Sequence, residues 1–282
     1  MGIKSKVKSL LQKIKAVSIP SAPPLQPTFS SYKEAEKAAG NYEENELIKV
    51  IVAKSVKYKN SLDDIETIDL DNLSNARTVR TLIAIAGGVN NNSLSVLDFG
   101  GSAGVHYFTA KKILNNSIKL KWTIVETKSM VSEARLNNLE NEELKFFSSV
   151  EEASRNNSKY DIVYANYSLC YTPEPLEYLK QLLELKYTTL FITNTALNPQ
   201  NVEIVGLQTS SLATNGIGRE IPKHLNISDK NIKYPFTVPS KKDVEEVILK
   251  DGNIISSFKE VKDSYKTEDG SFDNFGYIVT KK

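Results

Sequence analysis

The sequence predicts an α/β protein in which a helical N-terminal part precedes a doubly wound, mostly parallel sheet. Two observations support this prediction. From residue 95 onward, short apolar runs alternate with segments of helical pattern, which is typical of right-handed βαβ units with helices on both faces of a sheet. The run SVLDFGGSAGV, residues 95–105, places a glycine-rich turn after the first of these strands, where open α/β sheets bind ligands.

The composition is that of a globular protein without a strong overall charge. Among the 282 residues, 40% are apolar and the formal net charge is +2, so no global field favours nucleic acid. The single cysteine, Cys170, excludes an internal disulfide and favours a reducing, cytoplasmic setting. No apolar run approaches the roughly 18 residues of a membrane span. We therefore expect a cytoplasmic protein that does not bind nucleic acid.

Residues 1–28 form a basic segment. Its apolar residues fall at helical spacing, and the other face of the expected helix is rich in lysine: Ile3, Val7, Leu10, Leu11, Ile14 and Val17. Such a helix, within residues 1–17, suits the anionic inner face of a membrane or a protein partner. A solvated, loosely packed helix is an equal alternative. The following IPSAPPLQP is expected to be an extended linker.

Residues 29–90 are expected to form a helical extension that acts as a cap. YKEAEKAAG predicts a short helix that ends at Gly40, YEENELIKVIVAKSVKY predicts a longer amphipathic helix, and a third helix is expected from Ser74 to Ala86. Tyr32 and Tyr42 in this extension are expected to close over a cofactor or acceptor pocket.

Residues 91–282 are expected to form the main domain. Strands are predicted at SVLDF, KLKWTIVE, LKFFS, YDIVYANY and YTTLFITNT, with helices at AGVHYFTAKKIL, KSMVSEARLNNL, Val150–Ser154 and PEPLEYLKQLLEL. The long polar stretch 196–239 interrupts this rhythm and is expected to be a lid insert. A helix Lys241–Lys250 and two final strands, NIISSFKEVKDSY and FGYIVTKK, complete the domain.

The glycine turn argues against a dinucleotide. A dinucleotide site needs G-x-G-x-x-G, but Ser102 and Val105 stand at the second and third glycine positions. Asp98, two residues before Gly100, suits a ligand that carries an amine and would repel a pyrophosphate. An NAD-dependent oxidoreductase is therefore the weaker alternative.

At these residues the chain resembles the class I S-adenosylmethionine-dependent methyltransferases, whose Rossmann-like sheet has an antiparallel last strand. The resemblance implies S-adenosylmethionine as the cofactor, with Asp98 near its methionine amino group. It also implies that the cofactor passes against a turn of Gly100, Gly101, Ser102 and Gly104. Ser102 stands where a glycine is common in that family.

WTIVET carries a second part of the resemblance. Glu126 ends the second strand, 22 residues after Gly104, close to the spacing of about 20 at which an acid reaches ribose hydroxyls. The resemblance implies Glu126 as the ribose ligand, with Thr127 and Met130 near the adenine. The alternative is an ordinary exposed carboxylate at a strand end.

The stretch ANYSLCYTPEP carries a third part. Thr172 and Pro173 are expected to open the next helix. The resemblance places Asn166, Tyr167 and Tyr171 near the reacting centre, with Asn166 and Tyr167 toward the cofactor. Packing in the core is the alternative for both tyrosines.

Three side chains are candidates for catalysis. A hydroxyl acceptor usually needs a base, and the two histidines are His106, in the first turn after the glycines, and His224, in the expected lid. His106 faces either the cofactor or the sheet. Tyr171 can orient the acceptor or contact the sulfonium. No cluster of His, Cys and carboxylates has metal-ligand spacing, so no catalytic metal is expected.

Together with FSSYKEAEKAAGNYEENELIKVIVAKSV, these motifs are similar to a bacterial methyltransferase family found with surface-polysaccharide (O-antigen) gene clusters, over residues 29–282. That family usually has a more basic, proline-containing signature where this chain has ITNTALNPQ. The resemblance implies methyl transfer to an oxygen or nitrogen of a small-molecule or saccharide acceptor, in surface polysaccharide biosynthesis. The alternative is a non-catalytic scaffold protein that keeps the fold and the cofactor.

Overall fold

The main domain is built on a central sheet of eight strands. The computed structural model describes residues 28–39, 42–61, 92–114, 117–260, 265–267 and 270–282. The strands of the sheet are β2 (Ser93–Phe99), β3 (Lys119–Val125), β4 (Leu144–Phe147), β5 (Tyr160–Asn166), β6 (Tyr187–Leu197), β9 (Gly252–Lys259), β10 (Tyr265–Thr267) and β11 (Gly270–Lys281).

The order of the strands makes the sheet doubly wound. It runs β10-β11-β6-β5-β2-β3-β4. Outside this order, β9 pairs with residues 275–281 of β11. The strands from β2 to β6 pair in parallel, whereas β11 is antiparallel to both β6 and β9. The predicted α/β class, with a mostly parallel Rossmann-like sheet and antiparallel C-terminal strands, is therefore confirmed. The strand order changes direction at β2, because β3 and β4 lie on one side of it and β5 and β6 on the other. Ligands are therefore expected above the carboxyl ends of β2, β3 and β5.

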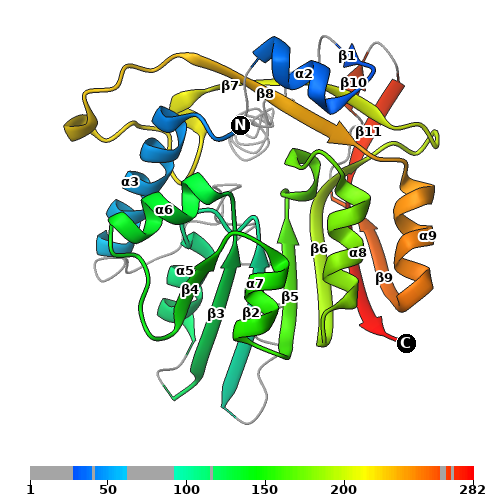
Figure 1. Cartoon of the computed structure of the whole chain (residues 1–282), viewed down its shortest axis with the longest axis horizontal. Helices are drawn as coiled ribbons and strands as arrows, with labels where there is room; N and C mark the ends of the chain where they lie inside the picture. The colour runs from blue at the N-terminus through cyan, green and yellow to red at the C-terminus, as the bar shows by residue number, and fades with distance from the viewer. Residues whose placement is uncertain (1–27, 40–41, 62–91, 115–116, 261–264, 268–269) are drawn as a thin grey trace, which may run out of the picture.

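Helices cover both faces of the sheet (Figure 1). On one face, α3 (Asn45–Ser61), α5 (Val105–Ile113) and α6 (Lys128–Leu136) pack through a core that includes Leu47, Trp122 and Tyr164. On the other, α7 (Val150–Asn156), α8 (Pro175–Glu184) and α9 (Lys241–Asp251) pack through a core that includes Val163 and Leu179. The strands between them are buried on both sides, which explains why they read as nearly continuous apolar runs.

A second, three-stranded sheet lies above the carboxyl ends of the main strands (Figure 1). It consists of β1 (Thr28–Phe29), β7 (Ile204–Ser211) and β8 (Asn231–Val238) in antiparallel order, and α2 (Tyr32–Ala39) packs against it. The stretch 196–239, expected to be a polar lid insert, contains two regular strands, β7 and β8. Residues 204–207 of β7 are buried, and its second half is only partly buried, so its alternation of polar and apolar residues is weak.

One helix start differs from the prediction. Thr172 and Pro173 were expected to open the helix after β5, but α8 begins at Pro175 with Glu174 as its N-cap residue. The reason is a short 3-10 turn, η2 (Leu169–Tyr171), for which Thr172 is the C-cap. The Thr172 hydroxyl donates to the carbonyl of Leu169 at 2.7 Å, so this side chain closes the 3-10 turn instead of opening the helix.

Several expectations concern residues outside those described. The basic helix within residues 1–17, the linker that follows it, Gly40, and the third helix from Ser74 to Ala86 all lie there. Within the described part of the chain, no helix is both long and apolar enough to cross a membrane.

Candidate functional site

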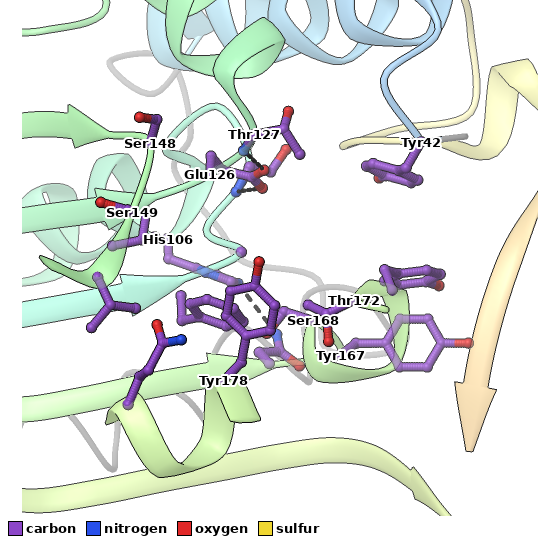
Figure 2. A pocket seen from close by; sticks show the side chains of 18 of the residues that line it. Tyr42, His106, Glu126, Thr127, Ser148, Ser149, Tyr167, Ser168, Thr172 and Tyr178 are labelled. Atoms are coloured by element: carbon purple, nitrogen blue, oxygen red, sulfur yellow. Dashed lines mark hydrogen bonds between the residues drawn. The ribbon is translucent and has the colours of Figure 1, made fainter. Parts of the chain in front are cut away.

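A long cleft of about 1270 Å³ opens above the carboxyl ends of β2, β3, β4 and β5. Its floor comes from the turns that follow these strands, and its far wall comes from β7, β8 and Tyr42, which precedes α3. Figure 2 shows Glu126 and Thr127 on one side of this space and Tyr42 facing it from another. The cleft thus lies between the two sheets, where an open α/β fold binds ligands.

The glycine turn brings backbone to the floor of the cleft. Gly100 has φ +68°, and a Cβ there would lie 2.3 Å from Cβ of Ser168. Ser102 also has a positive φ of 53°. Gly101 is not among the lining residues, but a Cβ there would lie 2.6 Å from the carboxylate of Asp98. The turn therefore needs glycine because of two neighbouring side chains, Asp98 in β2 and Ser168 just after β5.

Glu126 lines the cleft at the end of β3. Its Oε1 accepts from the backbone N–H of Ser102 at 2.9 Å, and its Oε2 accepts from the N–H of Thr127 at 3.0 Å. Burial raises the pKa of Glu126 to about 7, although these two N–H groups favour the charged form. Thr127 is also the N-cap of α6. The carboxylate is thus fixed in orientation and able to accept further hydrogen bonds from a diol.

Asp98 and His106 form a pair at the end of β2. Oδ2 of Asp98 lies 3.1 Å from Nδ1 of His106 and accepts from Nε1 of Trp122 at 3.2 Å. Asp98 is fully buried, whereas His106 is partly exposed and lines the cleft. The acid of the glycine motif is therefore separated from the cleft by a histidine side chain.

The end of β5 contributes Asn166, Tyr167 and Ser168. All three line the cleft, and Tyr167 adopts φ +53°, which is unusual for a large side chain and is typical of functional sites. The hydroxyl oxygen of Ser168 is buried and has no hydrogen-bond partner among the described residues. A polar atom in that state, at the floor of a cleft, favours a ligand that would satisfy it.

The far part of the cleft is aromatic. Tyr42 stacks on Tyr171 with ring centroids 5.4 Å apart and meets Tyr234 edge-on at 5.2 Å. The hydroxyl of Tyr171 donates to Oε1 of Gln208 at 3.0 Å, and the hydroxyl of Tyr32 donates to the carbonyl of Tyr171 at 3.1 Å. Burial raises the pKa of the Tyr171 hydroxyl well above its usual value, so this phenol stays protonated at neutral pH.

The predicted site residues divide into three groups: those that line the cleft, those that lie behind its lining, and His224, which lies outside it. The residues that line the cleft are Gly100, Ser102, His106, Glu126, Thr127, Asn166, Tyr167 and Tyr171. Behind them lie Asp98, Gly101, Gly104 and the fully buried Met130. His224 is exposed on η4 (Lys223–Leu225) and is not a lining residue. Among the described residues, no group of three His, Cys, Asp or Glu side chains could hold a metal ion.

Several lining residues were not predicted from the sequence: Ser148, Ser149, Ser168, Tyr178, Gln208, Ser210, Asn215 and Tyr234. Ser148 and Ser149 follow β4, so the rule that sites lie beyond strand ends could have found them. Gln208, Ser210 and Tyr234 lie on β7 and β8. No local signal marks these three, because they reach the cleft only through the pairing of the second sheet.

The comparisons with known proteins give structural likeness at low identity. No family model and no curated protein sequence matches the chain. The chain is similar to magnesium protoporphyrin IX methyltransferase (ChlM) from Synechocystis with bound SAH, at 12% identity and a TM-score of 0.45, over 85% of this chain and 100% of that one. It is similar to the CcbJ methyltransferase from Streptomyces caelestis at 13% identity and 0.45, over 73% and 95%. The N-terminal domain of EvdMO1, in the presence of SAH and D-fucose, matches at 8% identity and 0.45, over 73% and 83%.

Proposed function

We propose that this protein is an S-adenosylmethionine-dependent methyltransferase. The observation that carries the proposal is the Glu126 carboxylate. It is held by two backbone N–H groups beside the glycine turn, at the point where the winding of the sheet reverses. A ribose with two free hydroxyls matches a carboxylate in that place.

The residues present fit such a cofactor. The cleft volume of about 1270 Å³ is ample for an adenosine and an amino-acid chain. The glycine turn offers backbone without side chains, and the unpaired hydroxyl of Ser168 lies beside it. Glu126 would hold the ribose, and the turn after β4, with Ser148 and Ser149, would flank the adenine. When bound, the cofactor supplies an electrophilic methyl group on a sulfonium.

The acceptor is a small molecule, and we favour a saccharide whose oxygen or nitrogen is methylated. The support is chemical. Tyr42, Tyr171 and Tyr234 offer aromatic faces, and Gln208 and Ser210 beside them offer hydrogen-bonding groups, a combination that suits a ring with hydroxyls. Surface polysaccharide biosynthesis, suggested by the resemblance of the sequence motifs, is the setting we propose.

Calorimetric titration tests the proposal. S-adenosylmethionine and S-adenosylhomocysteine are titrated into the wild type and into Glu126→Ala. The wild type is expected to bind both ligands, and the variant is expected to bind them more weakly by about 1 to 3 kcal/mol, because the hydrogen-bonding partner of the ribose is removed. Absence of binding to the wild type would overturn the proposal.

A further inference from the structure

Tyr42 lies at the point where three separate parts of the chain meet the cleft. It precedes α3, and its ring stacks on Tyr171 of η2 with ring centroids 5.4 Å apart. It also meets Tyr234 of β8 edge-on at 5.2 Å. On the other side of the space, Figure 2 shows Glu126, which follows β3. Tyr42 therefore stands between the Glu126 carboxylate and the aromatic part of the cleft.

Electrostatic effects indicate that the segment around Tyr42 is close to the Glu126 carboxylate. Burial raises the pKa of the Tyr42 hydroxyl well above its usual value, and Tyr234 and Glu126 add to this effect. Burial is also the main cause that raises the pKa of Glu126, and the charges of Asp98 and Glu43 add to it. Such effects need short separations, because charges more than about 10 Å apart are largely screened. Residues 42 and 43 thus face the carboxylate across the cleft.

The hydroxyl of Tyr42 makes no hydrogen bond within the described residues. Its two aromatic neighbours differ in this respect. The hydroxyl of Tyr171 donates to Oε1 of Gln208 at 3.0 Å, and the hydroxyl of Tyr234 lies 3.0 Å from Oγ of Ser210. Because its pKa is raised, the Tyr42 phenol keeps its proton at neutral pH. It is therefore a hydrogen-bond donor that a ligand in the cleft can use.

The two groups that face each other have complementary requirements. Oε1 of Glu126 accepts from the N–H of Ser102 and Oε2 from the N–H of Thr127, and an ionised carboxylate can only accept further bonds. Tyr42 supplies a proton from the opposite side. A hydroxyl group satisfies both, since it donates one hydrogen bond and accepts others. A ribose hydroxyl that donates to Glu126 still has oxygen lone pairs for Tyr42.

The other polar groups of the cofactor suit this place less well. A carboxylate would be repelled by the negative charges of Glu126 and Glu43. An ammonium group has no lone pair with which to accept from a phenol. The ribose diol is therefore the part of the cofactor that matches both Tyr42 and Glu126.

We propose that the hydroxyl of Tyr42 donates a hydrogen bond to the ribose hydroxyl that donates to Glu126, so that the N-terminal extension completes the ribose site. This inference rests on the proposed function. It gives Tyr42 a second role besides that of an aromatic face for the acceptor. Since its ring stacks on Tyr171, the contact with the ribose also fixes one side of the aromatic part of the cleft.

Ribose-modified ligands test this contact. S-adenosylhomocysteine and its 2′-deoxy and 3′-deoxy analogues are titrated calorimetrically into the wild type and into Tyr42→Phe, which keeps the ring and removes the hydroxyl. Weakly bound analogues are measured by displacement of S-adenosylhomocysteine. Tyr42→Phe is expected to bind S-adenosylhomocysteine about 3- to 10-fold more weakly, because one neutral hydrogen bond is lost. For the analogue that lacks the contacted hydroxyl, the two proteins should agree within about 2-fold, and for the other analogue the loss should persist.

Tyr58→Phe is the matched control. Tyr58 lies on α3, its hydroxyl is 2.7 Å from Oγ1 of Thr109, and it does not line the cleft. This variant should bind all three ligands within about 2-fold of the wild type but unfold at a lower urea concentration, because a hydrogen bond within the protein is lost. Tyr42→Phe should show the opposite pattern, with a urea midpoint near that of the wild type and a lower affinity for S-adenosylhomocysteine.

The outcomes are distinct. Equal affinity of Tyr42→Phe and wild type for S-adenosylhomocysteine would overturn the inference, and a lower urea midpoint with unchanged affinity would reveal a merely structural role. An equal loss for S-adenosylhomocysteine and both analogues would assign the hydroxyl to another group and also overturn it. A loss that disappears with one analogue alone supports it. If the wild type binds no S-adenosylhomocysteine, the proposed function itself fails, which is a separate result.

Discussion

The backbone N–H of Ser102 donates to Oε1 of Glu126 at 2.9 Å and thereby joins the glycine turn after β2 to the end of β3. The second carboxylate oxygen accepts from the backbone N–H of Thr127, the N-cap residue of α6. The Glu126 side chain therefore fixes the position of the backbone that follows both β2 and β3 at the cleft. Its protonation state should influence both binding and stability.

The affinity for S-adenosylhomocysteine should increase with pH around neutrality. Burial raises the pKa of Glu126 to about 7, and ribose hydroxyls donate best to the ionised form. Binding is therefore expected to release a proton from Glu126 when the pH is near 6. Titrations at about pH 6, 7 and 8, in buffers of different ionisation enthalpy, measure this release. Glu126→Gln should bind weakly and with no pH dependence from this group; an equal dependence in the variant would assign the proton elsewhere.

The free protein should show the opposite trend in stability. The folded-state pKa of Glu126 is raised from 4.5 to about 7, so the contribution of this group is fully present below about pH 4.5 and is lost as the pH rises through 7. The loss should be ~2 kcal/mol, reduced from the full linkage value because the side chain is partly exposed. Urea unfolding from pH 5 to 8 should therefore show wild type falling relative to Glu126→Gln. Parallel curves would contradict the prediction.

Gly100→Ala should lower the free energy of unfolding by more than the cost of placing alanine in a left-handed backbone conformation. The new Cβ would lie 2.3 Å from Cβ of Ser168, at φ +68°. Gly218→Ala is the matched control, since Gly218 has φ +76° but nothing within 4 Å of a Cβ. The control should lose ~1 kcal/mol from the left-handed conformation, and Gly100→Ala should lose about 1 to 3 kcal/mol more from overpacking. Unfolding midpoints measure both.

A double variant identifies the source of the extra loss. Gly100→Ala combined with Ser168→Gly removes the atom that the new Cβ would meet, so part of the stability should return. If the double variant is no more stable than the sum of its parts, the clash is relieved by movement of the turn instead.

The sequence predicts those parts of the site that depend on local geometry. The glycine turn and Glu126 follow strands whose apolar runs are buried on both sides, so their places at one edge of the sheet follow from the parallel pairing. The pairing of Asp98 with His106 could not be read from the sequence, because a histidine at that position can face either the sheet or the cleft. Trp122, on the neighbouring strand, helps to hold the carboxylate from which the imidazole is oriented.

The second sheet could not be predicted for a different reason. β8 contains Pro235, opposite Leu207 of β7, and a proline argues against a strand when the pairing partner is unknown. β1, the third strand, comes from more than 170 residues earlier in the chain. The aromatic half of the cleft depends on these long-range pairings, which local periodicity does not encode.

Lys54→Met should loosen the loop that joins β7 to β8. Lys54 is 3% exposed, and its Nζ donates to the carbonyls of Ala213 at 2.6 Å and Asn215 at 2.7 Å. Methionine can replace the apolar stem but leaves these carbonyls unpaired, so the expected loss of stability is about 2 to 3 kcal/mol. The loop also supplies residues of the cleft wall, and the affinity for S-adenosylhomocysteine should fall less than the stability, because Glu126 is untouched.

Hydrogen exchange locates the effect of that change. In Lys54→Met, amides of residues 212–218 should lose protection before those of β2 and β3. The reason is that the described hydrogen bonds of the Lys54 ammonium all go to carbonyls of this loop. Lys57→Met, an exposed position one turn later on the same helix, is the matched control and should leave both stability and exchange near those of the wild type. If the two variants behave alike, the buried ammonium is not what holds the loop against α3. The apolar cluster that contains Ile51 of α3 and Leu212 of the loop must hold it instead.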